Sequence, residues 1–217
     1  MYCKEVSITE LCNIERAEVG KIYKAGTCYI KLSAVDEFVG QIKEAGVIDN
    51  RYAVMEPITE INTDYMYIAI ARSFPKFLRR YRTTINLQFQ ALKNFTVIWH
   101  EDEKEQQYVV ETMKKIQKEI DELRKDGTAK VIMYQSRIEN VKRDKTLSKG
   151  EKDSEIASCQ KELEQAKAVE AQNKDQIAKL IGKAENYLKN NFDKYYNAVK
   201  ASCIAEKEQA LQEHQQK

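Results

Sequence analysis

The sequence predicts an α+β protein: a small domain of short strands and helices, followed by long antiparallel coiled-coil helices. The composition changes sharply near residue 100. Both prolines, the only tryptophan and four of the seven glycines precede residue 101, whereas the remainder has no proline and 46 charged residues, 23 of each sign. We therefore divide the chain into a domain at residues 1–101 and a helical module at residues 102–217.

The first domain is predicted from alternating patterns and turn signals. Residues 28–33 and 51–55 alternate apolar and polar side chains as half-buried strands do. Residues 35–45 are compatible with a short helix ended by Gly46, and Pro57 stops the strand before it. Several short strands around one or two helices are the expected result.

Residues 63–82 are predicted to form a helix with a basic face. Apolar residues recur there at steps of three to four, namely Tyr67, Ile68, Ala71, Phe74, Phe77 and Leu78. From residue 65 to residue 100 there are six basic residues and no aspartate or glutamate. The alternation of Ile85, Leu87 and Phe89 indicates a strand, and residues 95–99 indicate a short buried one.

The helical module begins at Asp102, which has capping-box spacing to Glu105. The seam of a coiled coil follows at a 4-3-4-3 spacing, formed by Val109, Met113, Ile116, Ile120 and Leu123. Gly127 either ends this helix or weakens it. A turn is predicted near residues 146–150, where Ser148 and Glu151 form a second capping box. Each helix would be about 60 Å long at 1.5 Å per residue, so the seam must pair within the chain or with another chain.

Composition limits the function classes. The mean hydropathy is −0.64 and no segment is long and apolar enough to span a bilayer, so we expect a cytoplasmic protein without a membrane partner. The five cysteines are scattered and show no ligand spacing, so neither a metal site nor a disulfide framework is expected. No cofactor motif or catalytic constellation can be assembled. His100, at the end of a strand, is interpreted as structural, and the chain as a non-catalytic binding subunit.

Over residues 7–125 the sequence resembles the specificity (S) subunits of type I restriction-modification systems. The resemblance runs from ITELCNIERAEVGKIYKAGT through CYIKLSA and RYAVMEP to the block from residue 61 onward. That block is the most specific part, and the pair Glu105-Gln106 opens its long helix.

The resemblance implies a target recognition domain that reads one half of a bipartite DNA site. It also implies helices that act as a spacer and bind methyltransferase subunits, with a restriction subunit as a further possible partner. Complete S subunits have two recognition domains, whereas this chain has one. Either a homodimer supplies the second domain, or the second helix folds back on the first and leaves a monomer with a single reader.

Two basic segments are candidates for contact with double-stranded DNA. Phosphates attract lysine and arginine, while arginine, asparagine and glutamine can form paired hydrogen bonds with base edges. The candidate DNA-binding residues are Arg16, Lys21, Tyr23, Lys24, Lys76, Arg79, Arg80, Arg82, Thr83, Thr84, Asn86 and Gln88. The alternative interpretation of the basic segments is a solvated helix face.

The predicted function is sequence-specific DNA recognition by a half-length specificity subunit that directs methyltransferase and nuclease partners. The alternative is a decoy or regulator that docks on methyltransferase subunits through its helices without reading DNA. A tyrosine-rich stretch, which contains Tyr187, Phe192, Tyr195 and Tyr196, indicates either packing within the helices or a docking surface.

Overall fold

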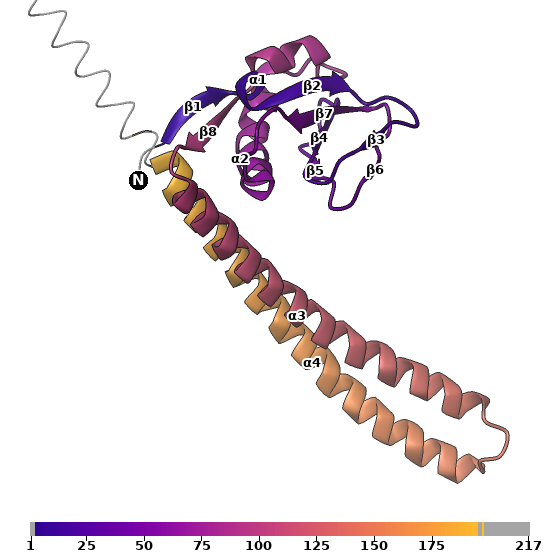
Figure 1. Cartoon of the computed structure of the whole chain (residues 1–217). Helices are drawn as coiled ribbons and strands as arrows, with labels where there is room; N and C mark the ends of the chain where they lie inside the picture. Colours follow the sequence, from indigo (N-terminus) through magenta and orange to yellow (C-terminus); the bar gives the residue numbers. More distant parts are fainter. Residues whose placement is uncertain (1–2, 195–196, 198–217) are drawn as a thin grey trace, which may run out of the picture. The chain divides into compact units, whose positions relative to one another are not determined.

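The computed structural model of the chain describes residues 3–194 and residue 197 (Figure 1). Its contacts form two compact units, one of residues 3–111 with residues 188–194, the other of residues 112–187. The first unit contains short strands and helices, and the second contains two long antiparallel helices. The predicted α+β class is confirmed.

The first unit contains eight strands, two α-helices and a 3-10 helix in its segment up to residue 100. In chain order these are β1 (Cys3–Ser7), α1 (Ile8–Leu11), β2 (Cys12–Arg16), β3 (Ile22–Tyr23), β4 (Cys28–Lys31), β5 (Val39–Gln41), β6 (Gly46–Val47), β7 (Tyr52–Pro57), α2 (Thr63–Tyr81), η1 (Phe89–Asn94) and β8 (Thr96–His100). The main sheet is antiparallel in the order β2-β7-β4-β5, and the pairs β1-β8 and β3-β6 form two small antiparallel ribbons.

The core lies between these sheets and α2. On β7, Ala53, Val54 and Met55 are fully buried, which fits a strand covered on both faces. The buried residues of α2 are Tyr65, Met66, Ala69, Ile70, Phe74, Phe77 and Leu78. The buried face predicted for this helix is correct in its second half. In its first half the buried face lies on other residues than those predicted. Residues 65–71 are apolar all round, so their spacing does not identify the buried face.

The helix expected at residues 35–45 is wrong, because this segment contains β5, which pairs with β4. Gly40 makes the pairing possible. A Cβ atom at this position would lie 2.2 Å from Cζ of Tyr29, so the Tyr29 ring occupies the space that a side chain would need. Packing across the sheet overrides the weak local preference.

The strand expected at Ile85, Leu87 and Phe89 is also wrong. Only Leu87 is buried, and it forms an isolated antiparallel bridge with Arg82. Residues 83–86 form a tight turn between these two residues, and η1 follows.

The helices α3 (Glu103–Arg143) and α4 (Lys149–Leu188) run antiparallel (Figure 1). Both ends of their connection are capped by side chains. The Thr146 N–H donates to Oδ1 of Asp144 (2.8 Å), and the Ser148 N–H donates to Oε2 of Glu151 (2.8 Å). The start signal at Ser148 is therefore confirmed, and the loop lies at residues 144–148.

The seam is covered within one chain. Ile116 and Ile120 are buried, and the two helices are tied together by the Asn173 side chain, whose Nδ2 donates to the Leu123 carbonyl (3.1 Å). The Arg137 guanidinium also pairs with Glu155 (3.2 Å). The seam therefore needs no second copy of the chain to remove its isoleucines from water.

Gly127 does not end α3 but lies at a close approach of the two helices. A Cβ atom there would lie 3.3 Å from Cγ and 3.4 Å from Cα of Glu170. Gly182 on α4 has nothing within 4 Å of its own Cβ position. The two glycines therefore allow a matched comparison.

We expect Gly127→Leu to reduce the free energy of unfolding of the helical unit by about 1–3 kcal/mol, because its side chain must push Glu170 aside. Gly182→Leu should raise that free energy by about 0.5–1 kcal/mol through helix propensity. Urea unfolding followed by circular dichroism measures both. Equal effects of the two substitutions would contradict the close approach at Gly127.

Candidate nucleic-acid interface

The end of α2 carries a cluster of exposed cations. Asn62 begins the helix by accepting a hydrogen bond from the Tyr65 N–H (3.1 Å), and the helix ends where the Arg82 N–H donates to the Leu78 carbonyl (2.9 Å). Because the buried face is apolar, the polar face carries the charges, and Lys76, Arg79 and Arg80 are exposed. Arginines in the last turn are also favoured by the helix dipole.

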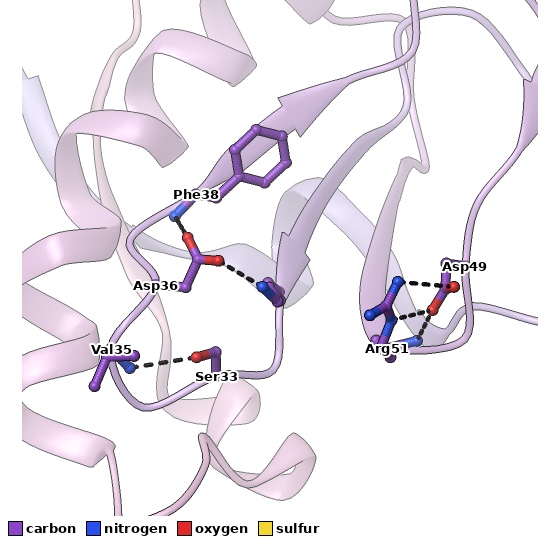
Figure 2. Close-up of polar contacts among 7 residues, drawn as sticks. Ser33, Val35, Asp36, Phe38, Asp49 and Arg51 are labelled. Carbon is purple, nitrogen blue, oxygen red and sulfur yellow. Dashed lines mark hydrogen bonds and ion pairs between the residues drawn. The ribbon is translucent and has the colours of Figure 1, made fainter.

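Lys76, Arg79 and Arg80 differ from Lys21 and Arg51 because none of them is in an ion pair with a described carboxylate, although the Arg80 guanidinium lies over the Tyr81 ring, 5.5 Å from its centroid. No carboxylate in residues 3–194 forms an ion pair with any of them. By contrast, Arg51 grips Asp49 through two nitrogens at 2.8 and 3.2 Å, as Figure 2 shows. A cation without a neighbouring carboxylate attracts an external anion more strongly, because no local negative charge offsets it.

Arg72 is a basic residue of the acid-free segment that serves the fold instead. Its guanidinium pairs with Asp193, which belongs to the π-helical segment η2 (Lys189–Lys194). This pairing joins residues 121 positions apart, so no local pattern could have predicted it.

A tight turn follows Arg79 and Arg80, and the side chains of Thr84 and Ile85 project from it. The Thr83 N–H donates to the Asn86 carbonyl (2.9 Å), and the Thr83 hydroxyl donates to the same oxygen (2.7 Å). Together with the Arg82–Leu87 bridge, these bonds close a hairpin, which we call the 82–87 hairpin, with Thr84 and Ile85 at its tip.

The amides of Asn86 and Gln88 lie beside one another, with Nε2 of Gln88 donating to Oδ1 of Asn86 (3.1 Å). Both residues are exposed. Oδ1 of Asn86, an acceptor predicted to read a base edge, is therefore already bonded within the protein. The Asn86 NH2 and the Gln88 side-chain carbonyl oxygen face no partner in the 82–87 hairpin.

Of the second basic segment, around β2 and β3, only Arg16 is shown to lie near the 82–87 hairpin. Arg16 lies over the Phe89 ring, 5.8 Å from its centroid, which connects it to η1 just beyond the 82–87 hairpin. Lys24 is exposed. Lys21 pairs with Glu15, and this hydrogen bond raises the pKa of Lys21.

Tyr23 needs a correction. Its side chain is 0% exposed in a core cluster with Val54 and Ile48, and its hydroxyl accepts a hydrogen bond from the Glu18 N–H (2.9 Å). A side chain enclosed in this way cannot contact DNA. Tyrosine in a glycine-flanked basic loop resembles a surface residue, and only the packing of residues 17–54 reveals its structural role.

The opposite end of α2 has the opposite charge. A hollow of about 920 Å³ lies between the start of this helix and the first turns of α3. Its lining includes Asn62, Trp99, Tyr108, Lys104 and four carboxylates, Glu60, Glu101, Glu103 and Glu111, of which Glu101 is in an ion pair with Lys4. Carboxylates repel anions, so this end of α2 is less favourable to an anionic ligand than the end that carries Lys76, Arg79 and Arg80.

His100 lies in a buried junction rather than in a reactive site. Its backbone N–H donates to the Tyr65 hydroxyl (3.0 Å), and the same hydroxyl forms a second hydrogen bond with His100 Nδ1 (2.6 Å), in which either atom can be the donor. Nε2 is buried among the described residues without a hydrogen bond of good geometry. Gln106 Nε2 donates to the His100 carbonyl (2.7 Å).

This junction predicts a loss of stability in acid. Burial lowers the pKa of His100 below its ordinary value of 6.5, although the charge of Glu105 opposes the shift. Because the unfolded chain then takes up the proton first, the His100 contribution is complete above pH 6.5 and falls as the pH drops toward the folded pKa.

We expect the free energy of unfolding from urea titrations to be lower at pH 5.5 than at pH 7.5. His100→Asn, which cannot titrate, should show a smaller difference between these two pH values. An equal difference in both proteins would assign the acid sensitivity to other groups.

The described residues contain no group of three or more histidine, cysteine or acidic side chains that could hold a metal. Burial raises the pKa of the Cys12 thiol to about 12, so this cysteine is held as an inert thiol. Cys203 lies outside the described residues.

Comparison with solved structures identifies the class of fold. The crystal structure of a type I restriction-modification system S subunit from M. genitalium is similar, with a TM-score of 0.51 and 12% sequence identity. The similarity covers 64% of this chain and 44% of that subunit, so the chain spans less than half the length of this structure. At this identity the likeness is one of fold.

A family model adds a second finding. The model described as "ABC transporter permease MglC, N-terminal domain" matches residues 100–217, more than half of the chain, and the chain belongs to this family through its helical part. The match begins at the last residue of β8 and leaves the strands before it unassigned. None of the described helices is long and apolar enough to cross a membrane. No curated protein matches the sequence.

Proposed function

We propose that this protein binds double-stranded DNA in a sequence-directed way, as a half-length specificity subunit of a type I-like restriction-modification assembly. In this proposal residues 1–101 read DNA, and residues 102–217 space the reader and bind methyltransferase and nuclease partners. The observation that carries the proposal is the set of unpaired, exposed arginines beside the 82–87 hairpin, in a segment of 36 residues without a carboxylate.

The two parts of this interface suit two different tasks. Lys76, Arg79 and Arg80 can neutralise phosphates, which supplies affinity without sequence information. The 82–87 hairpin is a narrow turn closed by one antiparallel bridge, and in this proposal its tip enters the major groove, where base edges can be read. The acidic hollow at the other end of α2 favours approach by this end.

The helical hairpin supports the second half of the proposal. Its seam is covered by its own second helix, so partners would meet the outer surface, where Ile132, Met133, Val169 and Ile181 are exposed. A seam closed within one chain also favours a monomer with one reader over a homodimer.

The test is selection of the purified protein against a random duplex pool at near-physiological salt, with sequencing of the retained duplexes. We expect enrichment of one half-site. Two inverted half-sites at fixed spacing would instead indicate a homodimer. If the folded protein enriches no motif, alone or with a methyltransferase subunit to which it binds, the DNA-reading function is wrong. The decoy is then the remaining interpretation.

A further inference from the structure

Ile85 is among the most exposed large apolar side chains that the structure describes, with 85% of its surface open. Single exposed aliphatic residues are ordinary on protein surfaces. Ile85 differs in that its position is fixed, because the bonds from Thr83 to Asn86 and the Arg82–Leu87 bridge hold the turn that carries it.

The base of the 82–87 hairpin is also anchored from outside. The Arg82 guanidinium donates to the Ala34 carbonyl (3.2 Å), which belongs to the loop between β4 and β5. That loop is itself held by internal bonds. The Phe38 N–H donates to Oδ1 of Asp36 (3.1 Å), as Figure 2 shows. Asp36 also pairs with Lys31 (2.8 Å). The base of the 82–87 hairpin is thus bonded to a loop that is itself held in place by hydrogen bonds.

The chemistry of the tip is apolar although its surroundings are cationic. The Thr83 hydroxyl and Oδ1 of Asn86 are bonded within the turn, whereas the Ile85 side chain has no role in the core. Arg79 and Arg80 precede it by a few residues and would hold the phosphates on either side of a groove. The tip would then meet the base edges.

The apolar group that base edges present in the major groove is the 5-methyl group of thymine. We propose, on the basis of the DNA-binding function proposed above, that Ile85 contacts a thymine methyl group and so selects a T·A pair at one position of the half-site. This interaction needs no hydrogen bond from the tip, in keeping with the internal bonding of its polar neighbours.

Uracil tests this contact, because it keeps the hydrogen-bonding edge of thymine and lacks only the methyl group. Each thymine of the selected duplex is replaced in turn by deoxyuridine, and the dissociation constant is measured. We expect about a fourfold loss of affinity at one position, the effect of one buried methyl group. Ile85→Ala should bind the thymine and uracil duplexes equally at that position.

Ile58→Ala is the matched control, since Ile58 follows β7, is 45% exposed and should leave the thymine preference unchanged. Melting curves establish that Ile85→Ala is folded. Equal affinity of the wild-type protein for every uracil duplex, or a preference for thymine that survives in Ile85→Ala, overturns the inference and leaves the proposed function standing. Absence of any sequence-specific binding by the wild-type protein overturns both.

Discussion

Arg79→Ala combined with Arg80→Ala should weaken binding of the selected duplex about 30-fold at physiological salt. Each phosphate contact releases roughly 0.9 of a counterion from the DNA, and losing that release lowers the affinity about fivefold at 0.15 M salt. Both side chains are exposed and neither is in an ion pair with a described residue, so their removal should leave the fold unchanged. Fluorescence anisotropy with a labelled duplex gives the dissociation constant.

The salt dependence separates a loss of specific contacts from a loss of net charge. The slope of log affinity against log salt concentration should become shallower by about two in the double variant. Arg124→Ala with Lys125→Ala removes the same charge from exposed positions on α3 and should leave both the affinity and the slope nearly unchanged. Equal losses in the two double variants would mean that the overall charge, and not the end of α2, attracts DNA.

Elements with strong local signals were predicted well. The strands at β4 and β7, the bounds of α2 and the cap at Ser148 all depend on residues within a few positions of one another. The failures at residues 35–45 and 85–89 arose where pairing with a distant strand or a tight turn decided the backbone. Local patterns contain no information about such partners.

The candidate interface shows the same division. The exposure of Arg79 and Arg80 follows from the amphipathic pattern of one helix, and it could be predicted. The burial of Tyr23 and the engagement of Arg72 by Asp193 depend on residues elsewhere in the chain, and they could not. The assignment of the exposed residues to DNA contact stays a prediction.

The C-terminal segment is part of the core of the first unit. Phe192 is 0% exposed, stacks on the Tyr65 ring at 6.0 Å and meets the His100 ring edge-on at 5.1 Å. Of the two interpretations of the tyrosine-rich stretch, packing therefore holds for Phe192, whereas Tyr195 and Tyr196 lie outside the described residues. A truncation before residue 185 would remove Phe192, so loss of partner binding in that truncation would reflect damage to the fold.

We expect Phe192→Ala to lower the free energy of unfolding by about 3–5 kcal/mol, the range for a buried phenylalanine that leaves a cavity. Trp99 is a convenient probe, because it is the only tryptophan and its ring lies 4.8 Å from that of Tyr65, the residue on which Phe192 stacks. Urea titration followed by its fluorescence measures the change.

Phe38→Ala removes the same atoms from a side chain that is 45% exposed, and it should cost less than half as much. A Phe192→Ala protein within 1 kcal/mol of the wild type, on the order of an ordinary surface substitution, would contradict the role of residues 188–194 in the core. The stretch around Phe192 would then be free to serve as a docking surface. A large loss means instead that the core of the first unit is complete only with residues 188–194, which follow the second long helix.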